Sequence, residues 1–86
     1  MAEKPAMTFR IGRIVVSIWR NTTKYGTEHY RADIARQWKE GEEWKESTGY
    51  YLEDLFILSH AALIAAEWVW DQKMAQNQEG ELKVAQ

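Results

Sequence analysis

The segment LEDLFILSHAALIAAEWVW, residues 52–70, decides the fold, because its apolar residues recur with the period of an α-helix. We expect one stripe of this helix to cover a β-sheet, and it contains Leu52, Leu55, Phe56, Ser59, Leu63, Ala66 and Trp70. A second stripe lies nearly opposite the first and contains Ile57, Ala61, Ile64 and Trp68. A helix that is apolar on two sides needs two partners, so we expect the second stripe to form the interface of a homodimer.

The sequence before the helix shows the alternation that is typical of β-strands. Residues 8–21, TFRIGRIVVSIWRN, predict two short strands or one bent strand, with the bend at Gly12. Residues 27–39 and residues 44–50 predict two more strands, each preceded by a turn rich in turn-forming residues. The predicted fold class is therefore α+β, with a four-stranded twisted antiparallel sheet followed by one long C-terminal helix (β-β-β-β-α).

Alternation also predicts which strand residues face the core. Ile14, Val16 and Ile18 share one side of their strand, and we expect that side to be buried. Trp19 falls on the other side, together with Arg31 and Lys45 of the later strands. We interpret four other aromatic residues as core filling, and these are Tyr30, Trp44, Tyr50 and Trp70.

The domain organisation follows from length and composition. At 86 residues without cysteine, the chain has room for one domain and no disulfide to stabilise it, which favours association with a second copy. We expect a flexible N-terminus over 1–7, a single domain over 8–73 and a flexible C-terminal tail over 74–86, where the apolar stripe is lost.

The longest apolar stretch, residues 55–66, is interrupted by Ser59 and His60 and is too short to span a bilayer. The N-terminal residues also lack the apolar run of a signal peptide. We therefore expect a soluble, cytoplasmic protein with no membrane partner, and the lack of cysteine fits a reducing compartment.

Motifs for catalysis and for metal binding are lacking in this sequence. His29 and His60 lie on separate expected elements, and neither has a partner at catalytic spacing. The acidic residues of the second turn are best explained as a solvated turn, and these are Glu40, Glu42, Glu43 and Glu46. We expect no enzymatic activity, no cofactor and no metal site.

The charge distribution separates the sheet from the helix. The net charge is −2, but residues 1–50 carry nine Lys/Arg and seven Asp/Glu, whereas residues 51–86 carry two and six. An aromatic ring flanked by cations, as expected for Trp19 between Arg31 and Lys45, is the arrangement that stacks bases and neutralises phosphates in proteins that bind single strands.

Several short motifs resemble the transcriptional coactivator PC4 family over about residues 9–70. These are FRIGR (9–13), VVSI (15–18), ADIARQW (32–38) and GEEWK (41–45), followed by the terminal helix. The resemblance implies a dimer that binds single-stranded DNA across its strands, as in PC4 and the Whirly-like folds. By position it implies DNA contacts for Arg13, Trp38 and Lys45. The sequence departs from the family at Ala35, where an arginine is usual, and at KESTG (45–49), which replaces a basic run.

The sequence therefore predicts a homodimeric, non-catalytic protein that binds single-stranded DNA or RNA in an accessory or transcription-regulatory role. The predicted nucleic-acid-binding residues are Arg13, Trp19, Arg31, Trp38 and Lys45. The alternative is a protein–protein interaction module on the same fold, for example an accessory or inhibitor protein of a mobile element, which the acidic turn and the acidic C-terminal half favour.

Overall fold

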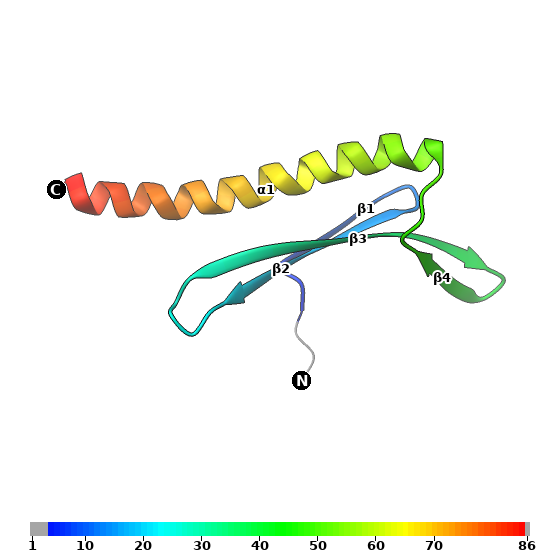
Figure 1. Ribbon diagram of the computed structural model, residues 1–86, viewed down its shortest axis with the longest axis horizontal. Coiled ribbons are helices and arrows are strands. Elements are labelled where there is room, and N and C mark those ends of the chain that lie inside the picture. The colour runs from blue at the N-terminus through cyan, green and yellow to red at the C-terminus, as the bar shows by residue number, and fades with distance from the viewer. Residues whose placement is uncertain (1–3, 86) are drawn as a thin grey trace.

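The structure is a computed structural model that describes residues 4–85, with side chains described for residues 4–75. Its elements are four strands and one helix, namely β1 (Met7–Ile11), β2 (Ile14–Thr22), β3 (Glu28–Glu40), β4 (Glu43–Ser47) and α1 (Leu52–Ala85). The strands form one antiparallel sheet in the order β1-β2-β3-β4, and α1 lies along one face of it (Figure 1). The predicted α+β fold class is confirmed.

Two tight hairpins set the register of the sheet. Gly12 and Arg13 connect β1 to β2, and Gly41 and Glu42 connect β3 to β4. The glycines have φ angles of 58° and 61°, and no other residue of either loop has a positive φ. A two-residue loop with a positive φ only at its first position is a type II′ turn, which matches the twist of the flanking strands. Gly12 therefore marks a hairpin between two strands and not a bend within one.

The core forms between the central strand β2 and the helix. Ile14, Val16 and Ile18 are completely buried, as the alternation predicts. Above them, Ala61 of α1 is completely buried and Ala65 nearly so. Partly buried residues of β1 extend this core toward one edge of the sheet, and these are Met7, Phe9 and Ile11.

The prediction of which helix stripe covers the sheet is wrong. The stripe predicted to cover it points away, with Phe56 71% exposed, Leu63 56% and Trp70 64%. The stripe predicted as the dimer interface lies on the sheet side, since Ala61 is buried, Ile57 and Trp68 pack against the core and Ile64 is half-buried. The physical reason is size, because the small side chains of Ala61 and Ala65 let the helix approach the sheet closely.

The predicted core role of four aromatic residues is correct for two of them. Tyr30 packs edge-to-face against Trp68 at a ring-centroid distance of 6.0 Å, and Tyr50 is half-buried with its hydroxyl donating to the Ile34 carbonyl at 2.7 Å. Trp44 and Trp70 are instead 61% and 64% exposed.

The helix is longer than the sequence pattern predicts. It continues to Ala85, through most of the segment predicted as a flexible tail over 74–86, and its C-terminal part projects beyond the sheet (Figure 1). Glu, Gln, Lys and Ala are intrinsically favourable in helices, so this part keeps helical geometry without an apolar stripe. Residues 1–3 of the predicted flexible N-terminus, and Gln86, lie outside the described residues. No described helix contains an apolar stretch long enough to cross a membrane.

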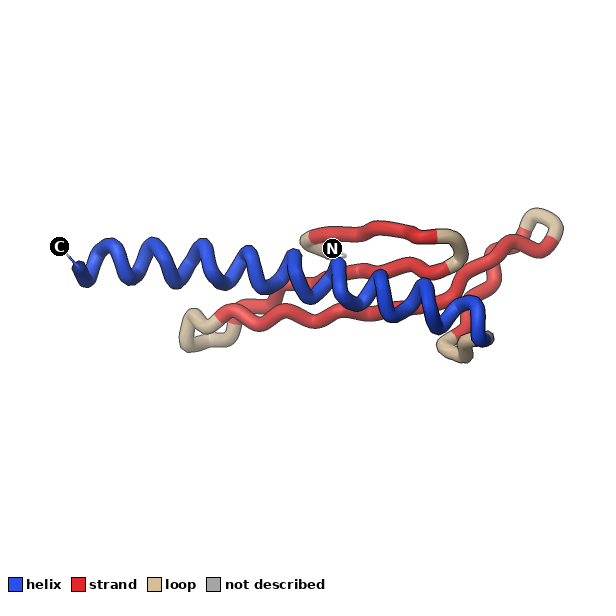
Figure 2. The backbone as a smooth tube through the Cα atoms, turned by 90° about the horizontal axis from the view of Figure 1, so that it is seen from above, coloured by secondary structure: helices blue, strands red, loops and turns tan. Residues whose placement is uncertain are grey.

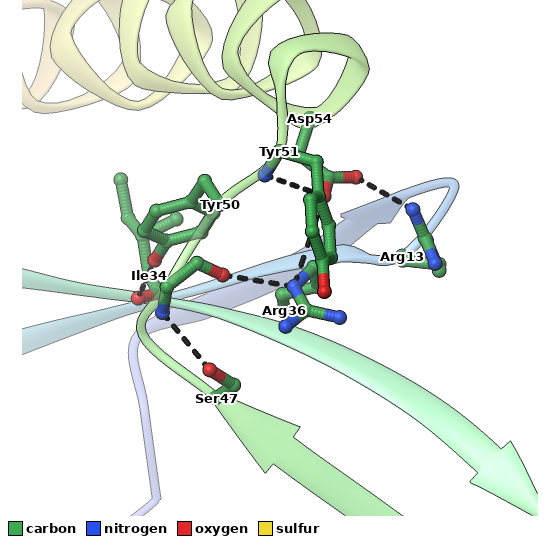
Figure 3. A network of polar contacts seen from close by, with 8 residues as sticks. Arg13, Ile34, Arg36, Ser47, Tyr50, Tyr51 and Asp54 are labelled. Atoms are coloured by element: carbon green, nitrogen blue, oxygen red, sulfur yellow. Dashed lines mark hydrogen bonds and ion pairs between the residues drawn. The ribbon is translucent and has the colours of Figure 1, made fainter.

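A buried carboxylate fixes the start of the helix over the sheet. Asp54 is 2% exposed, and its Oδ2 accepts a hydrogen bond from the Tyr51 backbone N–H at 3.1 Å (Figure 3). Tyr51 is the residue before the first helical position, so Asp54 satisfies one of the free amides by reaching back from the third position. The sequence analysis missed this cap because Tyr51 itself cannot provide it.

Two arginines from the sheet meet the same carboxylate. Arg13 Nη2 lies 3.1 Å from Asp54 Oδ1, and Arg36 Nε lies 3.7 Å from Oδ2 (Figure 3). Arg36 is itself buried and donates from Nε to the Gly49 carbonyl at 2.8 Å. Its guanidinium lies between the rings of Trp38 and Tyr51, at 4.5 and 5.0 Å from their centroids. This network joins the first hairpin, β3 and α1.

Candidate nucleic-acid interface

The face of the sheet opposite α1 is uncovered by the described residues (Figure 1). The register places on it the side chains that alternate with the core positions, since neighbouring residues of a strand point to opposite faces. We call this surface the open face. Its cations and large aromatic residues come from all four strands and are Arg10, Trp19, Arg31, Lys39 and Trp44.

At one end of the open face, Trp19 of β2 lies directly opposite Arg31 of β3. Trp19 is half-buried, and its indole Nε1 is buried without a hydrogen-bond partner among the described residues. Arg31 is exposed and forms an ion pair with Asp33, with 3.0 Å between Nη2 and Oδ2. The sequence predicted Trp19 and Arg31 as neighbours on this face, and that prediction is confirmed.

At the other end, Arg10 of β1 lies over the exposed ring of Trp44 in β4, with its guanidinium carbon 5.3 Å from the ring centroid. Hydrogen bonds hold this arginine in place. Its Nη1 donates to the Gly12 carbonyl at 3.1 Å, and its Nη2 donates to Gln37 Oε1 at 3.0 Å. Lys39 is opposite Trp44 in the register, so a second cation belongs to this end of the open face.

A shallow hollow of about 430 Å³ separates the two ends of the open face. Val15 and Ala35 belong to its lining, together with the carboxylates of Asp33 and Glu46. Glu46 Oε1 accepts a hydrogen bond from Gln37 Nε2 at 2.8 Å. Carboxylates repel phosphate but accept hydrogen bonds from base amino groups. The cations at both ends suit a phosphate backbone, and the hollow between them suits bases.

The five predicted nucleic-acid-binding residues do not share one surface. Trp38 and Lys45 lie opposite each other on the helix side of the sheet, where Arg36 stacks on Trp38 and Lys45 Nζ pairs with Glu43 at 3.0 Å. Arg13 belongs to the β1–β2 turn and pairs with Asp54. The prediction of one joint site is therefore wrong in geometry for these three residues, and only Trp19 and Arg31 lie on the open face.

Arg10, Lys39 and Trp44 were not predicted from the sequence as residues of this face. The error in β4 comes from the turn, because the two-residue loop pairs Glu40 with Glu43 and so places Trp44 opposite Lys39. Lys39 has the same parity as Arg31, so Trp44 belongs to the open face and Lys45 to the other. Reading the Glu-Gly-Glu-Glu segment as a type II′ turn would have given this register from the sequence.

Within the described residues, no group of three or more His, Cys, Asp or Glu side chains is arranged to hold a metal ion. No protein-family model matches the chain, and neither a curated protein nor a solved structure matches it.

Proposed function

We propose that this protein binds single-stranded nucleic acid on the open face, without catalysing a reaction, in an accessory role such as transcription regulation. The observation that carries the proposal is Arg10 over the exposed ring of Trp44, which is paired with Lys39 in the register, with Trp19 opposite Arg31 at the other end of the same uncovered sheet face. The similarity of FRIGR (9–13) and ADIARQW (32–38) to the PC4 family supports the same function.

The physical basis is stacking combined with phosphate neutralisation. An exposed tryptophan offers a flat surface to any base, and stacking on one aromatic ring contributes about 1–3 kcal/mol to binding. Trp44 is 61% exposed and can accept a base on the ring face away from Arg10. The cations contact phosphates without regard to sequence, so the expected binding is tolerant of base sequence.

The test is a fluorescence anisotropy titration of a labelled thymidine oligonucleotide at low salt. Neutralisation of about three phosphates on a single strand gives a slope of log K against log salt near −2. Absence of binding at tens of micromolar protein would refute the proposal, and so would an affinity that does not change with salt.

Two variants locate the binding surface. Trp44→Ala is expected to weaken binding by about 5- to 150-fold, which is the factor for one lost stacking contact. The matched control is Tyr25→Ala in the β2–β3 loop, because Tyr25 is also exposed and also has a cation, Lys24, 5.3 Å from its ring centroid. The control lies off the open face and should bind like the parent protein, and equal losses in both variants would contradict the assignment.

A protein partner is the second candidate function, and a different observation favours it. The outward stripe of α1 exposes large apolar side chains in the spacing of a helix-pairing seam, and these are Leu52, Phe56 and Leu63. Purification from a nuclease-treated lysate distinguishes the two functions. A protein that binds the chain directly stays bound after the nuclease, whereas a protein held through nucleic acid is lost.

A further inference from the structure

Strand β3 has one edge that no other described strand covers between His29 and Ala35. β2 pairs with residues 28–36 of β3, whereas β4 pairs only with residues 36–40. Within the described part of the chain, residues 29–35 therefore have a neighbouring strand on one side only, and Figure 2 shows the sheet from the side of the helix. The backbone N–H of Gln37 donates toward the β2 side, to the Arg13 carbonyl at 2.7 Å. By alternation, Tyr30, Ala32 and Ile34 direct their backbone groups to the free edge.

An apolar groove runs along this free edge. It has a volume of about 460 Å³ and lies between β3 and α1. Tyr30, Ala32 and Ile34 line it from the strand, and Ala62, Ala66 and Trp70 belong to its helix wall. An open strand edge beside apolar surface is a template for pairing with another strand.

We propose that the free edge of β3 pairs antiparallel with β3 of a second copy of this chain, around a two-fold axis at Ala32. Charge complementarity selects this register. With Ala32 opposite Ala32 of the second copy, Arg31 lies opposite Asp33 of the second copy, and Asp33 lies opposite its Arg31. Pairing centred one residue earlier or later would place Arg31 opposite Arg31 or Asp33 opposite Asp33, which is repulsive.

The same register satisfies the backbone and the apolar groove. Ala32 exchanges two backbone hydrogen bonds with its copy, and Tyr30 lies opposite Ile34 of the second copy on the groove side. The Ile34 carbonyl already accepts from Tyr50 Oη, and its second lone pair remains for the partner strand.

The two helices then lie on the same face of a continuous sheet that contains β1, β2 and β3 of both copies, with each β4 beyond the paired segment. Each helix packs on β2 and β3, so strands about 4.8 Å apart place the two helix axes about 10 Å from each other, the spacing of packed helices. They run antiparallel and meet at the small residues Ala62 and Ala66, with Trp70 covered by the other copy. The two open faces become one, so this association does not compete with nucleic-acid binding and does not depend on it.

Light scattering after gel filtration tests the proposal through a charge exchange. The parent protein is expected at twice the 10.1 kDa of one chain. Arg31→Asp and Asp33→Arg, each alone, place like charges opposite each other and should raise the dissociation constant at least tenfold. The double variant Arg31→Asp/Asp33→Arg restores opposite charges and should restore the dimer. Lys24→Asp makes the same charge change in the β2–β3 loop and should stay dimeric.

A cysteine at the two-fold axis gives an independent test, since the natural chain has no cysteine. Opposed Ala32 residues in a hydrogen-bonded pair have Cα atoms about 5.5 Å apart, within the range that a disulfide spans. Ala32→Cys should form a disulfide-linked dimer on mild oxidation, whereas Thr8→Cys on the opposite edge strand should not.

A monomeric parent protein at all concentrations would overturn the proposal. So would a dimer that survives both single charge variants, or one that Ala32→Cys fails to link.

Discussion

At the scale of single residues, Asp54 links the start of α1 to the β1–β2 turn and to β3. Its carboxylate is buried, caps the helix at Tyr51 and faces Arg13 and Arg36. Because Arg36 is also buried, removal of the carboxylate leaves a guanidinium with a single backbone acceptor in a poorly hydrated site. The effect of such a change is far larger than that of a surface ion pair.

We expect Asp54→Ala to lower the free energy of unfolding by about 3–5 kcal/mol, the usual result of breaking a buried ion pair from one side. The measurement is urea denaturation at one fixed protein concentration. Glu53→Ala is the control, because Glu53 is the neighbouring acidic residue of the first turn and is exposed. It should cost about 0.3–1 kcal/mol, the usual helix-dipole contribution, and equal losses in the two variants would contradict the role of Asp54.

The hairpin glycines lead to a second prediction at this scale. Gly41 has a φ of 61°, which costs about 1–2 kcal/mol for a residue with a side chain. Gly41→Ala should therefore lower the unfolding free energy by about that amount. The control is Gly49→Ala, since Gly49 has no positive φ and an added Cβ would lie 3.5 Å from Ser47 Oγ, an ordinary contact. A Gly49 variant less stable than the Gly41 variant would argue against the type II′ turn.

At the scale of elements, the helix orientation can be tested by overpacking. Ala61 is completely buried against the sheet, so Ala61→Leu should destabilise the protein by about 1–3 kcal/mol. Ala75→Leu adds the same atoms at an exposed position of the same helix and should leave stability within about 0.5 kcal/mol of the parent. Thermal denaturation of both variants decides the question, and a harmless Ala61→Leu would mean that the other stripe faces the sheet.

The number and order of these elements could be predicted from the sequence, because alternation in 14–18 and the helical period in 52–70 are both strong. The orientation of the helix could not, since both of its stripes are apolar and periodicity does not distinguish between them. The distance between the helix and the sheet decides the orientation of the helix. The small side chains of Ala61 and Ala65 allow a closer approach than Phe56 and Leu63. The site was half predicted for a similar reason, because alternation within a strand is readable but register across a turn depends on the turn type.

At the scale of the whole molecule, stability should depend on protein concentration. A small domain with an open strand edge and an exposed helix stripe gains stability when a second copy covers them, and mass action then raises Tm with concentration. We expect the Tm of the parent protein to rise when the protein concentration is increased a hundredfold. The Tm of Arg31→Asp should vary much less, and a parent Tm independent of concentration would oppose association in this range.

Because α1 follows the whole sheet in the sequence, it is synthesised after the strands that it covers. The apolar side of β2, from Ile14 to Ile18, is covered by helix residues as late as Val69. At about 5–20 residues per second, a ribosome takes roughly 3–10 s to add the residues between Ile18 and Val69. During that time the apolar surface of β2 has no helix to cover it. Arg13 also lacks its ion pair until Asp54 has been added. A chain that stops before residue 57 would therefore keep this apolar surface bare and should bind chaperones, whereas a chain that includes α1 can cover it.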